Sequence, residues 1–226
     1  TDGGLKRIKE IYGDSVVIVP YVMPGFDLAR LCAERFAADA GPQTRGMVLM
    51  NHGIFSFGET AKESYERMIE LVSRAEEYLE KRKAWHLPAP KVATVPARKD
   101  IAVLRREISE AAGFPVILAV HAGSASLAFA NRKDIGKISQ RGPATPDHVI
   151  RTKRVPLVGR DVQAYVKSYK QYFAKLAPKA KASMTMLDPA PRVVLDKELG
   201  VCAVGRSAKD AAIVFDIYEH TMEIIQ

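Results

Sequence analysis

The sequence predicts an α/β protein that carries a degenerate internal duplication. Short apolar stretches typical of strands alternate along the chain with longer stretches whose apolar residues recur at helical spacing. A strand-turn-strand-helix pattern near residue 53 recurs near residue 200. The 226 residues, of which 47% are apolar and 27% charged, can bury a core as one large domain or two small ones.

The first quarter of the chain predicts a strand, a helix and then a hairpin. Pro24 and Gly25 break the chain after the first apolar stretch, and Gly58 ends the last one. The expected elements are a strand over 14–22, a helix over 26–39, a strand over 46–50, a tight turn over 51–53 and a short strand over 54–57.

The clearest predicted element is a helix that begins near Thr60 and runs to about Lys83. Thr60 and Glu63 form a capping box, in which the hydroxyl and the carboxylate each accept a hydrogen bond from a free backbone N–H. Apolar residues then repeat at alternating steps of four and three, which predicts one continuous buried stripe. The residues of this stripe are Ala61, Tyr65, Met68, Val72, Ala75 and Leu79.

A proline-rich stretch separates the two predicted domains. Residues 85–98 have no apolar period and contain three prolines, so we expect a linker or an extended surface strap between a unit over 1–84 and a second, degenerate unit over 99–226. The second unit is expected to contain a helix over 101–113, strands over 115–121 and 124–130, a loop over 140–156, a helix over 159–176, a strand pair and a last helix.

The duplication bears on the turn that contains His52. When Gly53 is placed over Gly200, the following strand and the helix start match, and the strand before matches with one residue inserted. Leu199 then stands where His52 stands. The turn can therefore be built without a histidine, which favours a chemical role for His52.

Charge and cysteine content narrow the classes of partner. The formal charge of +8 and the pI near 9.4 are explained best by a solvated basic surface and next by binding of phosphorylated small molecules. Nucleic-acid binding ranks third, because no aromatic residues are interleaved with the basic ones. No apolar run is long enough to span a bilayer and no signal peptide is visible. Cys32 and Cys202 match no metal-ligand spacing, so we expect two reduced thiols in a cytoplasmic protein.

The first candidate for chemistry is His52, on the turn between two strands. A neutral imidazole on a short, well-anchored turn suits a divalent metal, and Gly53 adds no side chain that would crowd the ion. Zinc requires three or four such ligands, so one histidine does not make a site. From the residues alone, a structural role in the turn stays the alternative.

Residues 48–78, "VLMNHGIFSFGETAKESYERMIELVSRAEEY", closely resemble the C-terminal part of the class II aldolase/adducin fold. Members of that family include L-fuculose-1-phosphate and L-rhamnulose-1-phosphate aldolases. The segments 11–32, 141–161 and 187–221 look like the aldolase portion of long bifunctional proteins in which a rhamnulose-1-phosphate aldolase is fused to a short-chain alcohol dehydrogenase. The resemblance implies a three-layer α/β/α arrangement with a mixed, largely antiparallel sheet.

The same resemblance implies a metal centre and a reaction. His52 matches the family's third zinc ligand, and Zn²⁺ or another divalent ion would promote retro-aldol cleavage of a ketose 1-phosphate to dihydroxyacetone phosphate and, for rhamnulose, L-lactaldehyde. The family's H-x-H motif, acidic catalytic residue and phosphate loop do not occur here. In the long bifunctional proteins we expect them just upstream of the position of Thr1, so this chain either lacks its N-terminal part or is a variant without the site. We therefore predict that this chain is an inactive fragment of an enzyme that acts on a phosphorylated sugar as a homo-oligomer.

Several alternatives remain open from the sequence. A non-catalytic assembly module comparable to the adducin head is the second interpretation, and a nucleic-acid-binding module is the third. No G-x-G-x-x-G turn occurs, so no nicotinamide site is assigned. The remaining histidines are weaker candidates: His121 as a ligand of a second site, His148 beside Asp147 and three basic residues as a phosphate-binding group, and His86 and His220 without a role.

Overall fold

The computed structural model describes residues 3–84, 98–145, 148–180 and 182–225. The chain divides into two compact units, residues 1–86 and 87–226. Almost all of the predicted linker over 85–98, including His86, lies outside the described residues. Among the residues that the structure describes, no helix is both long and apolar enough to cross a membrane.

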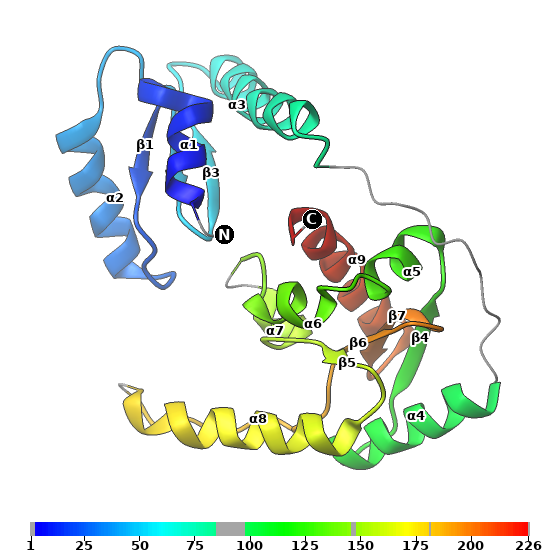
Figure 1. Cartoon of the computed structure of the whole chain (residues 1–226). Coiled ribbons are helices and arrows are strands. Elements are labelled where there is room, and N and C mark those ends of the chain that lie inside the picture. The colour runs from blue at the N-terminus through cyan, green and yellow to red at the C-terminus, as the bar shows by residue number, and fades with distance from the viewer. Residues whose placement is uncertain (1–2, 85–97, 146–147, 181, 226) are drawn as a thin grey trace. The chain divides into compact units, whose positions relative to one another are not determined.

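The first unit is a three-stranded mixed sheet with helices on both faces (Figure 1). The strands lie in the order β1-β2-β3, where β1 and β2 are parallel and β2 and β3 antiparallel. The elements are α1 (Gly4–Tyr12), the 3-10 turn η1 (Gly13–Ser15), β1 (Val16–Val19), α2 (Phe26–Asp39), β2 (Gly46–Leu49), β3 (Gly53–Ser56) and α3 (Ala61–Lys81).

Alternation along β1 divides the core of the first unit between the two faces of the sheet. Val17 and Val19 pack with Leu28 of α2 on one face. Val16 packs with Tyr12 of α1 and with Leu71 of α3 on the other face. The hydroxyl of Tyr12 donates a hydrogen bond to the carbonyl oxygen of Leu71 at 3.1 Å, which ties α1 to α3.

The second unit is a four-stranded mixed sheet in the order β4-β7-β6-β5. The β4/β7 and β7/β6 pairs are antiparallel and the β6/β5 pair is parallel. The elements are α4 (Arg98–Ala112), β4 (Ile117–His121), α5 (Ser124–Ala130), α6 (Ile135–Ile138), η2 (Ser139–Arg141), α7 (Val149–Thr152), β5 (Leu157–Val158), α8 (Val162–Leu176), η4 (Ala177–Lys179), β6 (Val193–Asp196), β7 (Gly200–Gly205) and α9 (Ala208–Ile225).

The helices of the second unit form two layers, one on each face of its sheet. One cluster of buried residues joins α4 and α8 to the sheet through residues such as Ile108, Val162 and Cys202. The other cluster joins α5, α6 and α9 to it through residues such as Phe129 and Val214. Figure 1 shows α4 and α8 on the opposite side of this sheet from α9 and α5. The predicted mixed α/β class is confirmed.

The two units repeat one topology from β1 to α3 and from β5 to α9. In the hairpins, Leu49 pairs with Gly53 and Asp196 pairs with Gly200, so each turn contains three residues. The predicted one-residue insertion before the second glycine is therefore wrong, because a constant offset aligns both hairpins. Position 52 still corresponds to Leu199.

Both helices that follow the hairpins have the predicted side-chain caps. Thr60 Oγ1 accepts a hydrogen bond from the N–H of Glu63 at 3.1 Å, and Ser207 Oγ accepts one from the N–H of Asp210 at 3.1 Å. The carboxylate of Glu63 accepts from the N–H of Glu59 at 2.8 Å and not from that of Thr60. The capping box is therefore present, with its return bond made one residue earlier.

The predicted buried stripe of α3 is correct only in part, because Ala75 packs against the core while other residues of the stripe are exposed. Tyr65 is 67% exposed and Val72 is 39% exposed, whereas Leu71 is fully buried. Two arginines face inward, because Arg67 donates to the carbonyl oxygen of Phe57 at 2.8 Å and Arg74 donates to that of Ile11 at 2.7 Å. Long polar side chains that bond to backbone carbonyls occupy positions that an apolar pattern assigns to solvent.

Two predictions for the second unit also differ from the structure. Residues 124–130 form the helix α5 and not a strand, and residues 126–130 are all buried, so their apolar pattern has no periodicity that separates helix from strand. The predicted loop over 140–156 contains the short helix α7.

Candidate functional site

The turn between β2 and β3 carries the candidate ligand His52. The N–H of His52 donates to the carbonyl oxygen of Leu49 at 3.0 Å, and the N–H of Met50 donates to that of Val19 on β1 at 2.9 Å. Asn51 adopts a left-handed conformation with φ of 59°, which asparagine tolerates better than most residues. Two strands and a closed turn thus fix the backbone of His52.

The imidazole of His52 has an unsatisfied nitrogen. Its Nδ1 atom is buried and has no hydrogen-bond partner among the described residues. A buried polar atom without a partner costs free energy, so such atoms in a folded protein usually have a ligand or water as their partner. The Nε2 of His121 and the hydroxyl of Tyr218 are likewise buried without a partner among the described residues.

The corresponding turn of the second unit is closed by an ion cluster. One carboxylate oxygen of Asp196 accepts hydrogen bonds from the N–H groups of Glu198 and Leu199 at 2.9 and 3.0 Å. Arg160 donates to the same carboxylate at 2.8 and 2.9 Å and also contacts Glu198 and Asp100. Leu199 is fully buried. This turn offers no metal-binding side chain at the position of His52.

The Arg160–Asp196 cluster was not predicted from the sequence. Burial alone would raise the pKa of Asp196, but hydrogen bonds from Arg160 and from the backbone of Leu199 and Glu198 outweigh it and hold the pKa below its usual value. The signal in the sequence is an aspartate at the end of a strand, four residues before a glycine. Its arginine partner is identifiable only when the pairing of β5 with β6 is known.

His121 has an environment typical of a packed side chain. Its ring stacks on Phe215 of α9 with centroids 3.4 Å apart and an interplanar angle of 5°. Its Nε2 is buried without a hydrogen-bond partner among the described residues. Burial lowers the pKa of His121, against the opposing effect of Glu219 and Asp216. The structure therefore gives this histidine a neutral, stacked position at the end of β4.

The basic residues around His148 are engaged in separate contacts. Lys153 is buried, donates to the carbonyl oxygen of Asp188 and lies 4.2 Å from the ring centroid of Tyr169. Arg154 lies over the ring of Tyr172, at 4.8 Å. Asp147 is outside the described residues. The structure does not bring these side chains together into a phosphate site.

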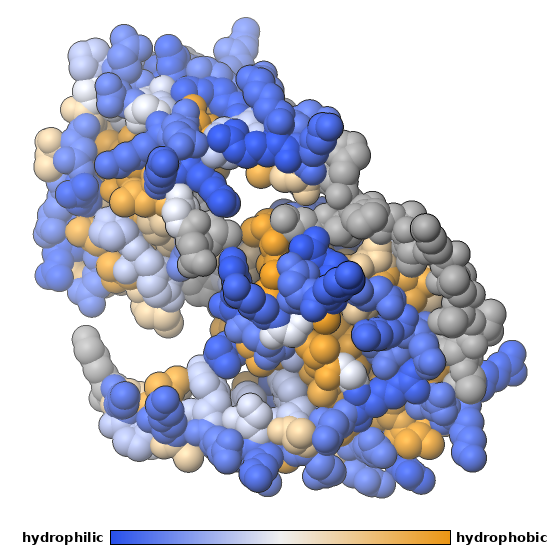
Figure 2. Space-filling model, in the orientation of Figure 1, coloured by the Kyte–Doolittle hydropathy of each residue, from blue (hydrophilic) through white to orange (hydrophobic). Residues whose placement is uncertain are grey.

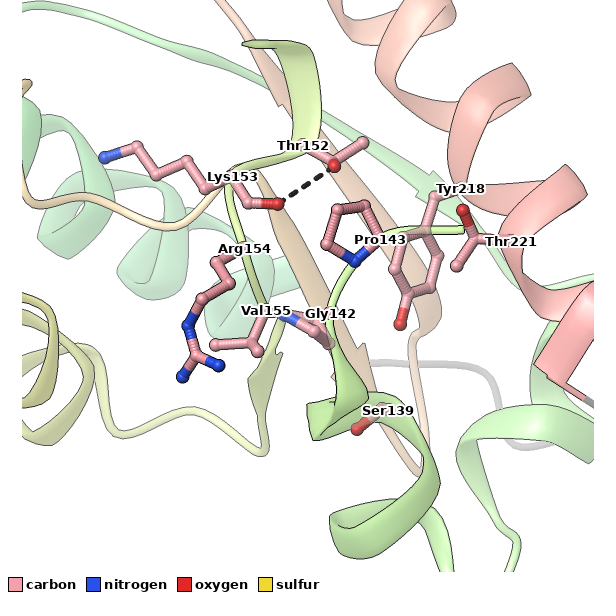
Figure 3. Close-up of a pocket in the computed structure, with 10 residues that line it drawn as sticks. Ser139, Gly142, Pro143, Thr152, Lys153, Arg154, Val155, Tyr218 and Thr221 are labelled. Carbon is pink, nitrogen blue, oxygen red and sulfur yellow. Dashed lines mark hydrogen bonds between the residues drawn. The ribbon is translucent and has the colours of Figure 1, made fainter. Parts of the chain in front are cut away.

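A small pocket in the second unit lies beside this segment (Figure 3). In Figure 3 the side chains of Lys153 and Arg154 extend away from Tyr218 and Pro143, which face each other across the pocket. The free volume of about 10 Å³ is enough for one water molecule and far too small for a sugar phosphate. We assign no substrate site to it.

The described residues do not by themselves fit a metal ion. Among residues 3–84, 98–145, 148–180 and 182–225, no three histidine, cysteine, aspartate or glutamate side chains lie close enough together to hold one. His220, on α9, contacts Glu223 at 3.4 Å and is exposed. His52 can therefore act only as one ligand of a site completed by other residues.

Comparison with known proteins places both units in one family. The family model described as "Aldolase class II, second domain" matches residues 95–226, more than half of the chain. The model described as "Class II Aldolase and Adducin N-terminal domain" matches residues 5–79. The chain belongs to the class II aldolase/adducin family. The predicted family is thus confirmed, while the specificity for rhamnulose 1-phosphate stays a prediction.

Two known proteins are similar to this chain over part of their own length. The chain is 27% identical over 252 residues to a protein of Bacillus subtilis (strain 168) named "Uncharacterized oxidoreductase YuxG" and spans 35% of that protein's length. A solved N-terminal class II aldolase domain of a conserved protein from Thermoplasma acidophilum is 42% identical over 35% of each chain, with a TM-score of 0.30.

Proposed function

We propose that this chain is part of a divalent-metal-dependent class II sugar-phosphate aldolase and that His52 is one ligand of its metal, with zinc as the first candidate. The reaction would be the reversible cleavage of a ketose 1-phosphate such as L-rhamnulose 1-phosphate to dihydroxyacetone phosphate and L-lactaldehyde. The chain on its own is predicted to be inactive, because the described residues supply a single ligand.

The unsatisfied Nδ1 of His52 is the observation that supports this proposal best. His52 stands on a rigid turn with that nitrogen buried, whereas the repeated turn has the apolar Leu199 at the same position and closes through Asp196. Membership in the class II aldolase family supports the reaction class.

A fused dehydrogenase is the second part of the proposal. The relative named an oxidoreductase is about three times as long as the segment it shares with this chain. An aldehyde released by the aldolase would be a substrate that a short-chain dehydrogenase can oxidise. We therefore propose that the natural polypeptide couples the cleavage to an oxidation and that it works in the cytoplasm as a homo-oligomer.

The test is the metal content of the natural-length polypeptide, purified without chelator and measured by elemental mass spectrometry. We expect close to one metal ion per polypeptide, lost in His52→Ala. The matched control is His220→Ala, because His220 is exposed on α9 and should leave the metal content unchanged. Loss of aldol cleavage in His52→Ala with unchanged thermal unfolding would then assign the residue to the reaction. Equal metal content in the wild type and His52→Ala would refute the ligand role.

A non-catalytic assembly module is the second candidate. Two observations favour it. No three metal-binding side chains lie together among the described residues, and the second turn is closed by hydrogen bonds to its own Asp196. It predicts no bound metal in any of the three proteins. The same measurement therefore separates the two functions.

A further inference from the structure

The connection between α8 and β6 is an addition to the repeated topology. In the first unit, the connection between α2 and β2 covers residues 40–45, whereas its equivalent between α8 and β6 covers residues 177–192. Apart from the 3-10 turn η4, the described part of this longer connection contains no helix or strand. Long connections of this kind are uncommon in compact domains and frequently carry a function. Residues 170–187, the second half of α8 and most of the connection, form what we call the α8 arm.

The α8 arm extends past the core of the second unit. The last residue of α8 in the core is Tyr169, and no residue from 170 to 176 is buried. The chain returns to Tyr169 only at Asp188, because Lys153 contacts Asp188 and lies over the ring of Tyr169. Residues 182–187 are all exposed, and Figure 1 shows this connection running back along α8. The arm therefore consists of an exposed helix end and an exposed segment beside it.

Large apolar side chains on the α8 arm are exposed to water. On the helix, Tyr172 and Leu176 are 37% and 40% exposed. On the connection, Met184, Met186 and Leu187 are 57%, 36% and 61% exposed. Apolar side chains gathered on one segment are costly in water, and such a patch marks a surface that binds an apolar partner.

The same part of the chain has positive charge without compensating acidic residues. No aspartate or glutamate occurs in residues 162–187. Four exposed lysines of this range form no ion pair with a described residue. They are Lys167, Lys170, Lys175 and Lys179. Cations on other helices have an acidic partner one turn away, as Arg35 has Asp39 on α2 and Arg106 has Glu110 on α4. The arm therefore attracts negative charge from outside the second unit.

We propose that the α8 arm binds the surface of a membrane that contains anionic lipids. On α8, Tyr172 and Leu176 continue the side of the helix that Tyr169 occupies. Lys170 and Lys175 lie on the two flanks of that side. Segments that combine lysines with exposed leucine and aromatic side chains lie in the interface of a bilayer. The apolar side chains enter the boundary between head groups and acyl chains, and the ammonium groups contact anionic head groups.

The composition of the arm argues against other partners. It contains no arginine, whereas protein interfaces are enriched in arginine and depleted in lysine. Apart from Tyr172, its exposed large apolar residues are leucine and methionine, whose side chains cannot stack on nucleic-acid bases. An arm of a second copy would bring lysines against lysines. An anionic lipid surface matches both the charge and the apolar side chains.

The first experiment measures binding of the natural-length polypeptide to vesicles by sedimentation. Vesicles of phosphatidylcholine alone are compared with vesicles that also contain phosphatidylglycerol, at low and at high salt. We expect binding to the anionic vesicles only, weakened at high salt because counterions screen the head groups. No binding to the anionic vesicles, or equal binding to both kinds, would overturn the proposal.

Two matched lysine variants assign the binding to the arm. In Lys170→Gln/Lys175→Gln we expect the partition coefficient for anionic vesicles to fall about 25-fold, because each lysine near such a surface contributes roughly five-fold. The control is Lys62→Gln/Lys81→Gln, which removes the same charge from exposed lysines of α3. An equal loss in the control would assign the binding to net charge alone and would overturn the proposal.

A second pair of variants tests the apolar side chains at constant charge. Met184→Ser/Leu187→Ser should weaken binding to anionic vesicles about 10-fold, because neither side chain would then enter the lipid. The control is Ile150→Ser, because Ile150 is 74% exposed on α7 and lies outside the arm. All of these side chains are exposed, so thermal unfolding should not change. Unchanged vesicle binding in Met184→Ser/Leu187→Ser would overturn the proposal, as would binding of single-stranded RNA in place of vesicles. Vesicle binding and metal content are separate measurements, so failure of this proposal leaves the role of His52 intact.

Discussion

Removal of the Asp196 carboxylate should destabilise the second unit strongly. In Asp196→Ala, the N–H groups of Glu198 and Leu199 lose their acceptor, and Arg160 loses its least exposed partner. A buried donor left without an acceptor costs about 1–3 kcal/mol. Arg160 keeps Asp100 and Glu198 as partners, so we expect a total loss of about 3 kcal/mol, near the lower limit for a broken buried ion pair.

The matched control for Asp196→Ala is Asp134→Ala. Asp134 also makes two hydrogen bonds with one arginine, at 2.9 Å each to Arg132, but its side chain is 47% exposed and that of Asp196 only 10%. An exposed pair contributes about 1 kcal/mol or less. The assay is urea unfolding followed by far-UV circular dichroism, with the change expected in a single transition. An equal loss of unfolding free energy in the two variants would refute the argument that the Arg160–Asp196 pair stabilises the protein more because it is buried.

Three further predictions follow from burial and charge. Leu71→Ala should lower the free energy of unfolding, measured with urea, by about 2–5 kcal/mol, and the adjacent Val72→Ala should lower it by about 0.5 kcal/mol. A larger loss in Val72→Ala than in Leu71→Ala would show that Val72, as predicted from the sequence, lies on the buried face of α3. Because the pKa of Asp196 is lower in the folded than in the unfolded protein, its stabilisation is complete above the unfolded value of about 4 and is lost as the pH falls through the folded value. The stability difference between wild type and Asp196→Ala should therefore shrink in acid, and a constant difference would contradict the assignment. Burial raises the pKa of the Cys202 thiol to about 12, so a disulfide reagent should label Cys32 in the native protein and Cys202 only after unfolding.

Periodicity in the sequence predicted elements well where one face of a helix or strand is exposed. The helix α3, its Thr60 cap and the hairpin before it lie close to where the pattern placed them. The buried face of α3 was misplaced because Arg67 and Arg74 reach backbone carbonyls from inward-facing positions. The helix α5 was assigned as a strand because its residues 126–130 are all buried, which removes the contrast on which periodicity depends.

The candidate site could be predicted only in part, for a similar reason. His52 was identified from its place between two strands and from the resemblance, and both are local features of the sequence. The link between Arg160 and Asp196 joins residues 36 positions apart, and the register of β5 and β6 brings them together. Figure 2 shows hydrophilic residues over most of the visible surface, with smaller hydrophobic areas between them. The local pattern of the sequence did not separate such exposed apolar side chains from those of the core.

The two hairpin turns share one backbone topology but differ in how their polar groups are satisfied. At the last paired residue of the first strand, a leucine in one unit is replaced by Asp196 in the other, whose carboxylate satisfies the N–H groups of its turn. A turn satisfied internally in this way can bury an apolar residue, and Leu199 is fully buried there. The first turn has no such carboxylate and keeps a histidine nitrogen without a partner among the described residues. The change at Asp196 and the change at Leu199 are therefore coupled, because a turn whose N–H groups are satisfied by its own aspartate can bury an apolar side chain. Restoring a histidine alone, as in Leu199→His, would bury a second imidazole without creating a site.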